Sequence, residues 1–208
     1  MYLATKYRDP LRELLNIGAG RAAAELNSML ECAIQLRVPA LEIINVQELN
    51  ERPLLVDNES MTTVQLPFSG TFCGEAVLGF PASSATNLVE LLLGGDSEEH
   101  RTQREATLTE IGNILLNSVM GTIANVLSGE FEYEVPCFRE GVGNPVLRTA
   151  PGEGATILVT NTRFTAAGHS IEGDIHIVFA IGGFERLMTA IDTVDAEHST
   201  AEKVSALA

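Results

Sequence analysis

The sequence predicts an α+β fold in which two long helices cover one face of a shared antiparallel sheet. Apolar residues recur near every 3.6 positions from Pro10 to about Leu30, which indicates an amphipathic helix, and alternating segments typical of strands follow it. The same order of helix, strand, hairpin and short helix begins again near Ala106. An order of elements that recurs within one chain predicts an internal duplication.

The predicted organisation is a single domain, residues 1–208, made of two pseudo-repeats at about 8–95 and 102–194. Strands of the two repeats most simply share one sheet. The long helices then pack on one face of that sheet with their polar residues outward. The end of the chain, 195–208, is polar and rich in small residues, so we expect a flexible tail there.

In the first repeat, the long helix is expected to begin at Pro10, because proline is favoured at the first helical position and Asp9 before it can act as the N-cap. The strand after this helix should end at Pro39. This strand is expected at Ile34–Val38, and an antiparallel hairpin at Thr63–Phe68 with Gly74–Phe80. A short helix is expected at Pro81–Leu93, and a charged linker follows at Asp96–Gln103.

The second repeat follows the same plan. Thr102 and Glu105 have the spacing of a capping box, which predicts the start of the second long helix. A strand is expected at Tyr133–Phe138, and a Gly/Pro-rich loop at Glu140–Gly154. A hairpin is expected at Thr156–Phe164 with Gly173–Phe179, and a short helix at Phe184–Val194.

Composition excludes several classes of function. The formal net charge is −15 and the Lys and Arg residues are scattered, whereas nucleic-acid binders carry a basic patch, so no nucleic-acid partner is expected. No apolar run is long enough to span a membrane, and the N-terminal segment lacks the apolar core of a secretory signal. Together with three widely spaced cysteines, these features predict a cytoplasmic protein.

Polar residues recur at matching positions of the two long helices. Asp9, Glu13 and Asn16 lie at i, i+4 and i+7, so they share one helix face. Glu110 and Asn113 repeat the Glu-x-x-Asn pair in the second helix. One such pair is typical of an ordinary solvated helix face. In each copy, however, the Asn is followed after 22 residues by a proline, and this shared long spacing indicates a functional motif.

The full pattern, Asp/Ser-x3-Glu-x2-Asn-x22-Pro, resembles the signature of the CheC/CheX/FliY family of chemotaxis phosphatases. The first copy matches it at all four positions, ending at Pro39. The second copy matches at Glu110, Asn113 and Pro136, but Ala106 stands where the family has Ser or Asp. The resemblance covers roughly residues 8–194, and the length and duplicated layout are most similar to the CheC type.

This resemblance implies a phosphatase that hydrolyses the aspartyl phosphate of a CheY-type response regulator. It assigns Asn16 and Asn113 to orienting the attacking water in line with phosphorus, and Glu13 and Glu110 to contacting the regulator. Asp9 is a candidate accessory residue. The resemblance implies no cofactor held by this chain, and places Mg²⁺ on the partner regulator.

Two other functions remain open at this point. One is a binding module of the flagellar switch that senses the regulator without hydrolysis. The other is an adaptor for CheD, with the exposed side of Phe184–Val194 as the candidate surface. The retained Glu-Asn pairs favour the phosphatase. If Asp9 only caps its helix, both motifs should be active despite Ala106, whereas a direct contact with the regulator would leave the second motif weaker.

Two further patterns are interpreted structurally. Gly18 and Gly20 imitate part of a dinucleotide-binding motif, but they follow a helix start rather than a strand, so we expect them to let the two long helices approach closely. The histidines do not have metal-ligand spacing, and no protein-bound metal is expected.

Overall fold

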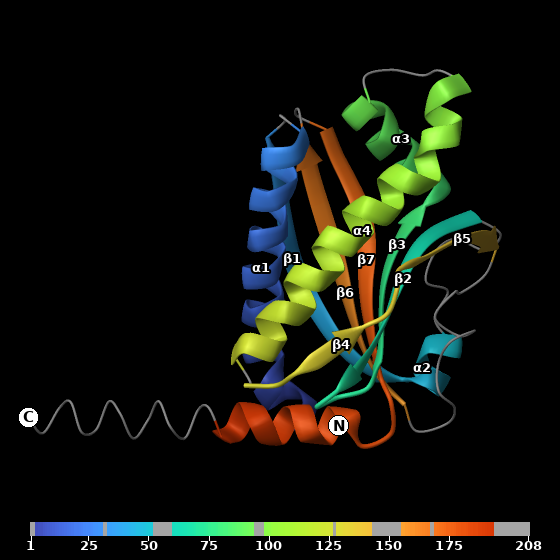
Figure 1. Ribbon diagram of the computed structural model, residues 1–208. Helices are drawn as coiled ribbons and strands as arrows, with labels where there is room; N and C mark the ends of the chain where they lie inside the picture. The colour runs from blue at the N-terminus through green and yellow to red at the C-terminus, as the bar shows by residue number, and fades with distance from the viewer. Residues whose placement is uncertain are drawn as a thin grey trace, which may run out of the picture.

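The computed structural model describes residues 3–30, 33–51, 60–93, 98–126, 128–142, 155–166 and 169–193. Their strands form one seven-stranded antiparallel sheet in the order β1-β6-β7-β3-β2-β4, with β5 also paired to β2. The strands are β1 (Ile34–Asn45), β2 (Ser60–Gly70), β3 (Gly74–Pro81), β4 (Phe131–Tyr133), β5 (Cys137–Val142), β6 (Thr156–Ala166) and β7 (His169–Phe179). The long helices α1 (Leu3–Leu30) and α4 (Glu98–Val126) cross one face of this sheet (Figure 1). The predicted α+β fold is confirmed.

Strands from the two halves of the chain are interleaved in this sheet. Strand β1 pairs with β6 of the second half, β2 pairs with β4 and β5 of the second half, and β3 pairs with β7 at the centre. The order reads the same from either edge when β1 is exchanged with β4 and β5, β2 with β6, and β3 with β7. Two copies of one unit that share a sheet would give this order, although the duplication itself stays a prediction.

Two short helices each contact the long helix of the other half of the chain. Helix α3 (Ala82–Leu93) lies against α4, where the Arg104 guanidinium donates to the Thr86 hydroxyl at 2.9 Å. The helix at 183–193 lies at the first turns of α1, where the Tyr7 hydroxyl donates to Asp192 at 2.7 Å. A third short helix, α2 (Val46–Glu51), follows β1 directly. None of the helices among the described residues is long and apolar enough to cross a membrane.

The core lies between the sheet and the two long helices. Leu11, Leu15, Leu108 and Leu115 are fully buried beneath the helices. The inner face of the sheet contributes apolar side chains that include Leu66, Leu78, Leu158, Ile177 and Phe179. Burial of this apolar surface is the main favourable term that holds the helices on the sheet.

Both long helices begin earlier than predicted. Helix α1 starts at Leu3, so Pro10 lies inside it and Asp9 is not an N-cap. Tyr7 is buried and bonded to Asp192, and this tertiary packing outweighs the single backbone hydrogen bond that a proline removes. Helix α4 starts at Glu98, so Thr102 does not cap it and the predicted linker at 96–103 is helical from Glu98 onward.

The predicted end of the first strand at Pro39 is also wrong, because β1 continues to Asn45. Arg37 pairs with Arg163 and Ala40 pairs with Asn161, so two residues of β1 lie opposite the single residue Thr162. This is a β-bulge, one of the few places where a strand accepts a proline. Strand β1 is also an edge strand, which has a hydrogen-bonded neighbour on one side only, so a proline without an N–H is tolerated there.

A similar irregularity divides the strand predicted at Tyr133–Phe138. Phe68 pairs with Tyr133 and Gln65 pairs with Cys137, which leaves three residues of the second half opposite two of β2. Pro136, which has no N–H, lies in this insertion. The insertion separates β4 from β5, and the two prolines of the motif therefore mark bulges at opposite edges of the sheet.

The other predicted elements are found close to their expected positions. The β2–β3 and β6–β7 hairpins form, and so do the short helices at 82–93 and 183–193. The predicted tail at 195–208 and most of the predicted loop at 140–154 lie outside the described residues.

A close approach of α1 and α4 depends on Gly18. A Cβ atom at this position would lie 2.6 Å from the Cα of Val119 on α4, whereas a Cβ at Gly20 would meet no atom within 4 Å. The predicted role in helix packing therefore applies to Gly18 and not to Gly20.

We predict that Gly18→Ala lowers the free energy of unfolding by about 1–3 kcal/mol, because the helix backbones must separate. Gly20→Ala is the matched control and should raise it by up to about 1 kcal/mol through better helix propensity. Urea denaturation of both variants measures the difference. Equal stability of the two variants would contradict the close packing at Gly18.

Candidate functional site

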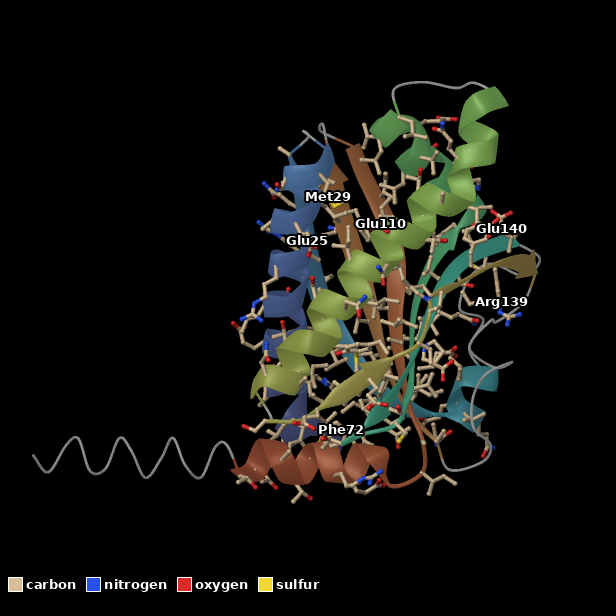
Figure 2. The ribbon with its side chains drawn as sticks, in the orientation of Figure 1. Glu25, Met29, Phe72, Glu110, Arg139 and Glu140 are labelled. Carbon is tan, nitrogen blue, oxygen red and sulfur yellow. The ribbon has the colours of Figure 1, made fainter. Side chains whose placement is uncertain are left out.

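The predicted site residues lie on the two long helices, and the prediction that they all face outward is wrong for Asn16, which is turned toward β1. Glu13 and Asn16 lie on α1, and Glu110 and Asn113 lie on α4. The two glutamates are exposed and the two asparagines are partly buried. In Figure 2, Glu110 lies on the viewer's side of α4, away from the sheet. The structure brings Glu and Asn together within each motif, but it places the two motifs on separate helices.

In the first motif, the Asn16 carboxamide is bonded to the backbone of β1. The Val38 N–H donates to Asn16 Oδ1 at 2.9 Å, and Asn16 Nδ2 donates to the Val38 carbonyl at 3.1 Å. Nδ2 also donates to the Arg12 carbonyl at 2.9 Å. A carboxamide has two N–H donors, so both donors of Asn16 have protein acceptors.

The bulge in β1 explains why Val38 is available to Asn16. Val38 lies in the part of β1 that has no register partner on β6, and its side chain is buried. A buried backbone N–H or C=O without a partner is costly, and the Asn16 side chain supplies both partners. The Asn-x22-Pro spacing of the first copy thus has a structural meaning: it places the bulge residue before Pro39 beside Asn16.

The second motif has the same spacing but different contacts. Val135, which precedes Pro136, is 85% exposed, and no hydrogen bond within the described residues joins it to Asn113. Instead, Asn117 Nδ2 donates to Asn113 Oδ1 at 2.6 Å. Among the described residues, no acceptor is bonded to the Asn113 N–H groups, so this carboxamide keeps both donors for a ligand.

Asp9 takes a different place from the predicted one. Its side chain is 79% exposed within α1 and lies 3.2 Å from the Arg12 guanidinium, one turn further along the helix. Exposed pairs of this kind contribute little to stability. The equivalent Ala106 is also exposed and lies inside α4. Since neither residue is at a helix start, the capping explanation for Asp9 is wrong.

A hollow of about 530 Å³ lies next to the first motif, where α1 passes the edge strand β1. Arg8 and Arg12 line it on the helix side, and residues 39–44 line it along β1. The lining carries both signs of charge, because Glu42 of β1 and Glu48 of α2 lie in it together with the two arginines, so the hollow is not a positive patch.

No histidine or cysteine stands at a defining position of either motif. No group of three His, Cys, Asp or Glu residues there could hold a metal ion. His176 on β7 is buried, and burial lowers its pKa to about 4, so it is neutral at physiological pH. Strand alternation places it on the sheet face opposite the helices. The chemistry available at the motifs is therefore that of exposed carboxylates and partly buried carboxamides.

Sequence reasoning missed two features of these sites. Asn117 was visible as a second asparagine at i+4 from Asn113, but Gly20 occupies the matching position in the first copy, so it formed no repeated pattern. The role of Val38 depends on the register of β1 and β6, which periodicity does not give.

Comparison with known proteins places these features in context. No family model matches the chain. CheC of Bacillus subtilis strain 168, whose name describes a CheY-P phosphatase, is 24% identical over 201 residues, covering 88% of this chain and 92% of CheC. The structure of Thermotoga maritima FliY superposes with a TM-score of 0.74 at 15% identity, covering 93% of this chain and 100% of that chain.

The chain has the CheC-like fold. The predicted resemblance to the CheC/CheX/FliY family is thereby confirmed. A FliM structure, in the FliG–FliM complex of H. pylori, has the same fold with a TM-score of 0.60 at 13% identity, covering 86% of this chain and 94% of that chain. The CheC-like fold is thus shared by proteins with different names and partners, and the fold alone does not select an activity.

The two asparagines should differ in their contribution to stability. Asn16→Ala leaves the Val38 N–H and C=O without partners, so we expect the free energy of unfolding to fall by about 1–3 kcal/mol. Asn113→Ala removes the same atoms but frees no backbone group, so we expect a change below about 0.5 kcal/mol. Urea denaturation compares the variants, and hydrogen exchange at the Val38 amide should accelerate only in Asn16→Ala. Equal losses would contradict the contacts described above.

Proposed function

We propose that this protein hydrolyses the aspartyl phosphate of a CheY-type response regulator. The observation that carries the proposal is the Glu-x-x-Asn pair of α4, whose glutamate is exposed and whose asparagine keeps free amide donors, in a chain similar to CheC over 88% of its length. The exposed Glu110 would contact the regulator, and Asn113 would orient the attacking water.

The chemistry supports this division of work. Phosphoryl transfer needs positioning and charge stabilisation more than covalent participation by the protein. A carboxamide can accept a hydrogen bond from a water through its oxygen and donate through its nitrogen, so it can fix the direction of that water. Mg²⁺ would be held by the regulator's own acidic pocket. No histidine or metal of this chain is required at the motif.

The two motifs are proposed to differ in activity. Asn16 can orient a water with an N–H group only after that group leaves Val38 or Arg12. Release of the N–H held by Val38 would leave a buried carbonyl unpaired, at a cost of about 1–3 kcal/mol, or roughly five- to 150-fold in the fraction of Asn16 that can bind a water. Asn113 has no such bond to break within the described residues. We therefore propose that the second motif is the main site, although it lacks the Asp or Ser that precedes the first.

The likeness to FliM supports a second candidate function. A non-hydrolytic binding module of the flagellar switch would use the same fold and exposed helix faces to hold the regulator. The adaptor role toward CheD stays a prediction, with the exposed Glu185 and Arg186 of the helix at 183–193 as its proposed surface. The free amide donors of Asn113 favour the phosphatase over either binding role.

The test is phosphate release from a panel of purified phosphorylated CheY-type regulators, each with Mg²⁺, in the presence and absence of this protein. We expect release to accelerate for at least one regulator. The control is the double variant Asn16→Ala with Asn113→Ala, which should lose at least about tenfold of that acceleration because no carboxamide orients the water. Tight binding of a phosphorylated regulator without faster release would instead support the binding module.

A further inference from the structure

Asn117 lies one helical turn after Asn113 on α4 and touches its carboxamide. Residues four apart on a helix are neighbours, and helical side chains lean toward the N-terminus, so the Asn117 side chain leans toward Asn113. Its Nδ2 donates to Asn113 Oδ1 at 2.6 Å, and both side chains are partly buried. The contact is therefore built into the helix and does not need a partner protein.

This bond determines which way the Asn113 carboxamide faces. A carboxamide can rotate by half a turn and exchange its oxygen and nitrogen. With a donor from Asn117 fixed at Oδ1, the rotated form would place two N–H groups against each other, which is unfavourable. One lone pair of Oδ1 is used by Asn117. The other lone pair and the two N–H donors remain for a water and a phosphoryl oxygen.

The first motif lacks this arrangement. The position equivalent to Asn117 is Gly20, which has no side chain, and the Asn16 carboxamide is instead held by the Val38 backbone. The Val38 contacts use both an acceptor and a donor of Asn16, whereas the Asn117 contact uses only one acceptor of Asn113. Only the second arrangement fixes the amide and leaves its donors available.

We propose that Asn117 is a positioning residue of the second motif, which holds the Asn113 carboxamide in the orientation that binds the attacking water. The proposal rests on the phosphatase function proposed above. Asn117 does not touch the reacting atoms. It reduces the rotational freedom that Asn113 would otherwise lose when the phosphorylated regulator binds.

The experiment uses the full chain with Glu13→Ala and Asn16→Ala, so that only the second motif acts on a phosphorylated regulator. Asn117→Ala should lower kcat about three- to tenfold, the size expected when one side chain must be ordered during the reaction, while KM stays within about twofold. Asn117→Asp keeps the shape but offers no donor and favours the reversed amide, so its kcat should be lower still. Carbon-13 NMR of the Asn113 side-chain carbonyl should report the lost bond in both variants.

Control proteins separate the possible outcomes. The same Asn117 substitutions should have no effect on phosphate release when Glu110 and Asn113 are replaced by Ala and the first motif is kept. If the parent protein with only the second motif releases no phosphate from any regulator, the proposed activity of that motif fails. If the parent is active and both Asn117 variants keep its kcat, or lose activity only in proportion to thermal stability, the positioning role is wrong.

Discussion

The bond between the Asn16 side chain and the Val38 backbone is the constraint that organises one side of this molecule. A bulge in an edge strand leaves a buried N–H and C=O without strand partners, and the helix above supplies both. A second asparagine of α1, Asn27, bonds the Ile34 backbone in the same way, so the helix is attached to the strand at two points. Glu13, three residues before Asn16 on α1, remains exposed.

The opposite edge of the sheet solves the same problem differently. There the insertion that contains Pro136 divides the strand, and Val135 is exposed. The Glu134 N–H donates to the Pro67 carbonyl of β2 at 3.1 Å. Within the described residues, the Asn113 side chain bonds no strand backbone, and its hydrogen-bond partner is Asn117. Two motifs that are nearly equal in sequence are therefore unequal in the hydrogen-bonding capacity that they offer to a partner.

Local patterns predicted most of the fold, because the hairpins and the two long helices are encoded by spacing that can be counted along the chain. The helix starts were not predictable, since they depend on contacts such as Tyr7 with Asp192 and Arg104 with Glu140, which join residues distant in sequence. The same limit applies to the site. Repetition identified Glu13, Asn16, Glu110 and Asn113, but only the strand register shows what Asn16 is bonded to.

The measurement that tests this account most directly compares two single-site proteins on one phosphorylated regulator. One carries Glu13→Ala with Asn16→Ala, and the other carries Glu110→Ala with Asn113→Ala, each assayed at a temperature where circular dichroism shows it folded. We predict that the first protein keeps most of the phosphate release and the second keeps about a tenth or less, since both N–H donors of Asn16 are already bonded, to Val38 and to Arg12. Equal activities, or activity confined to the protein that retains Glu13 and Asn16, would contradict it.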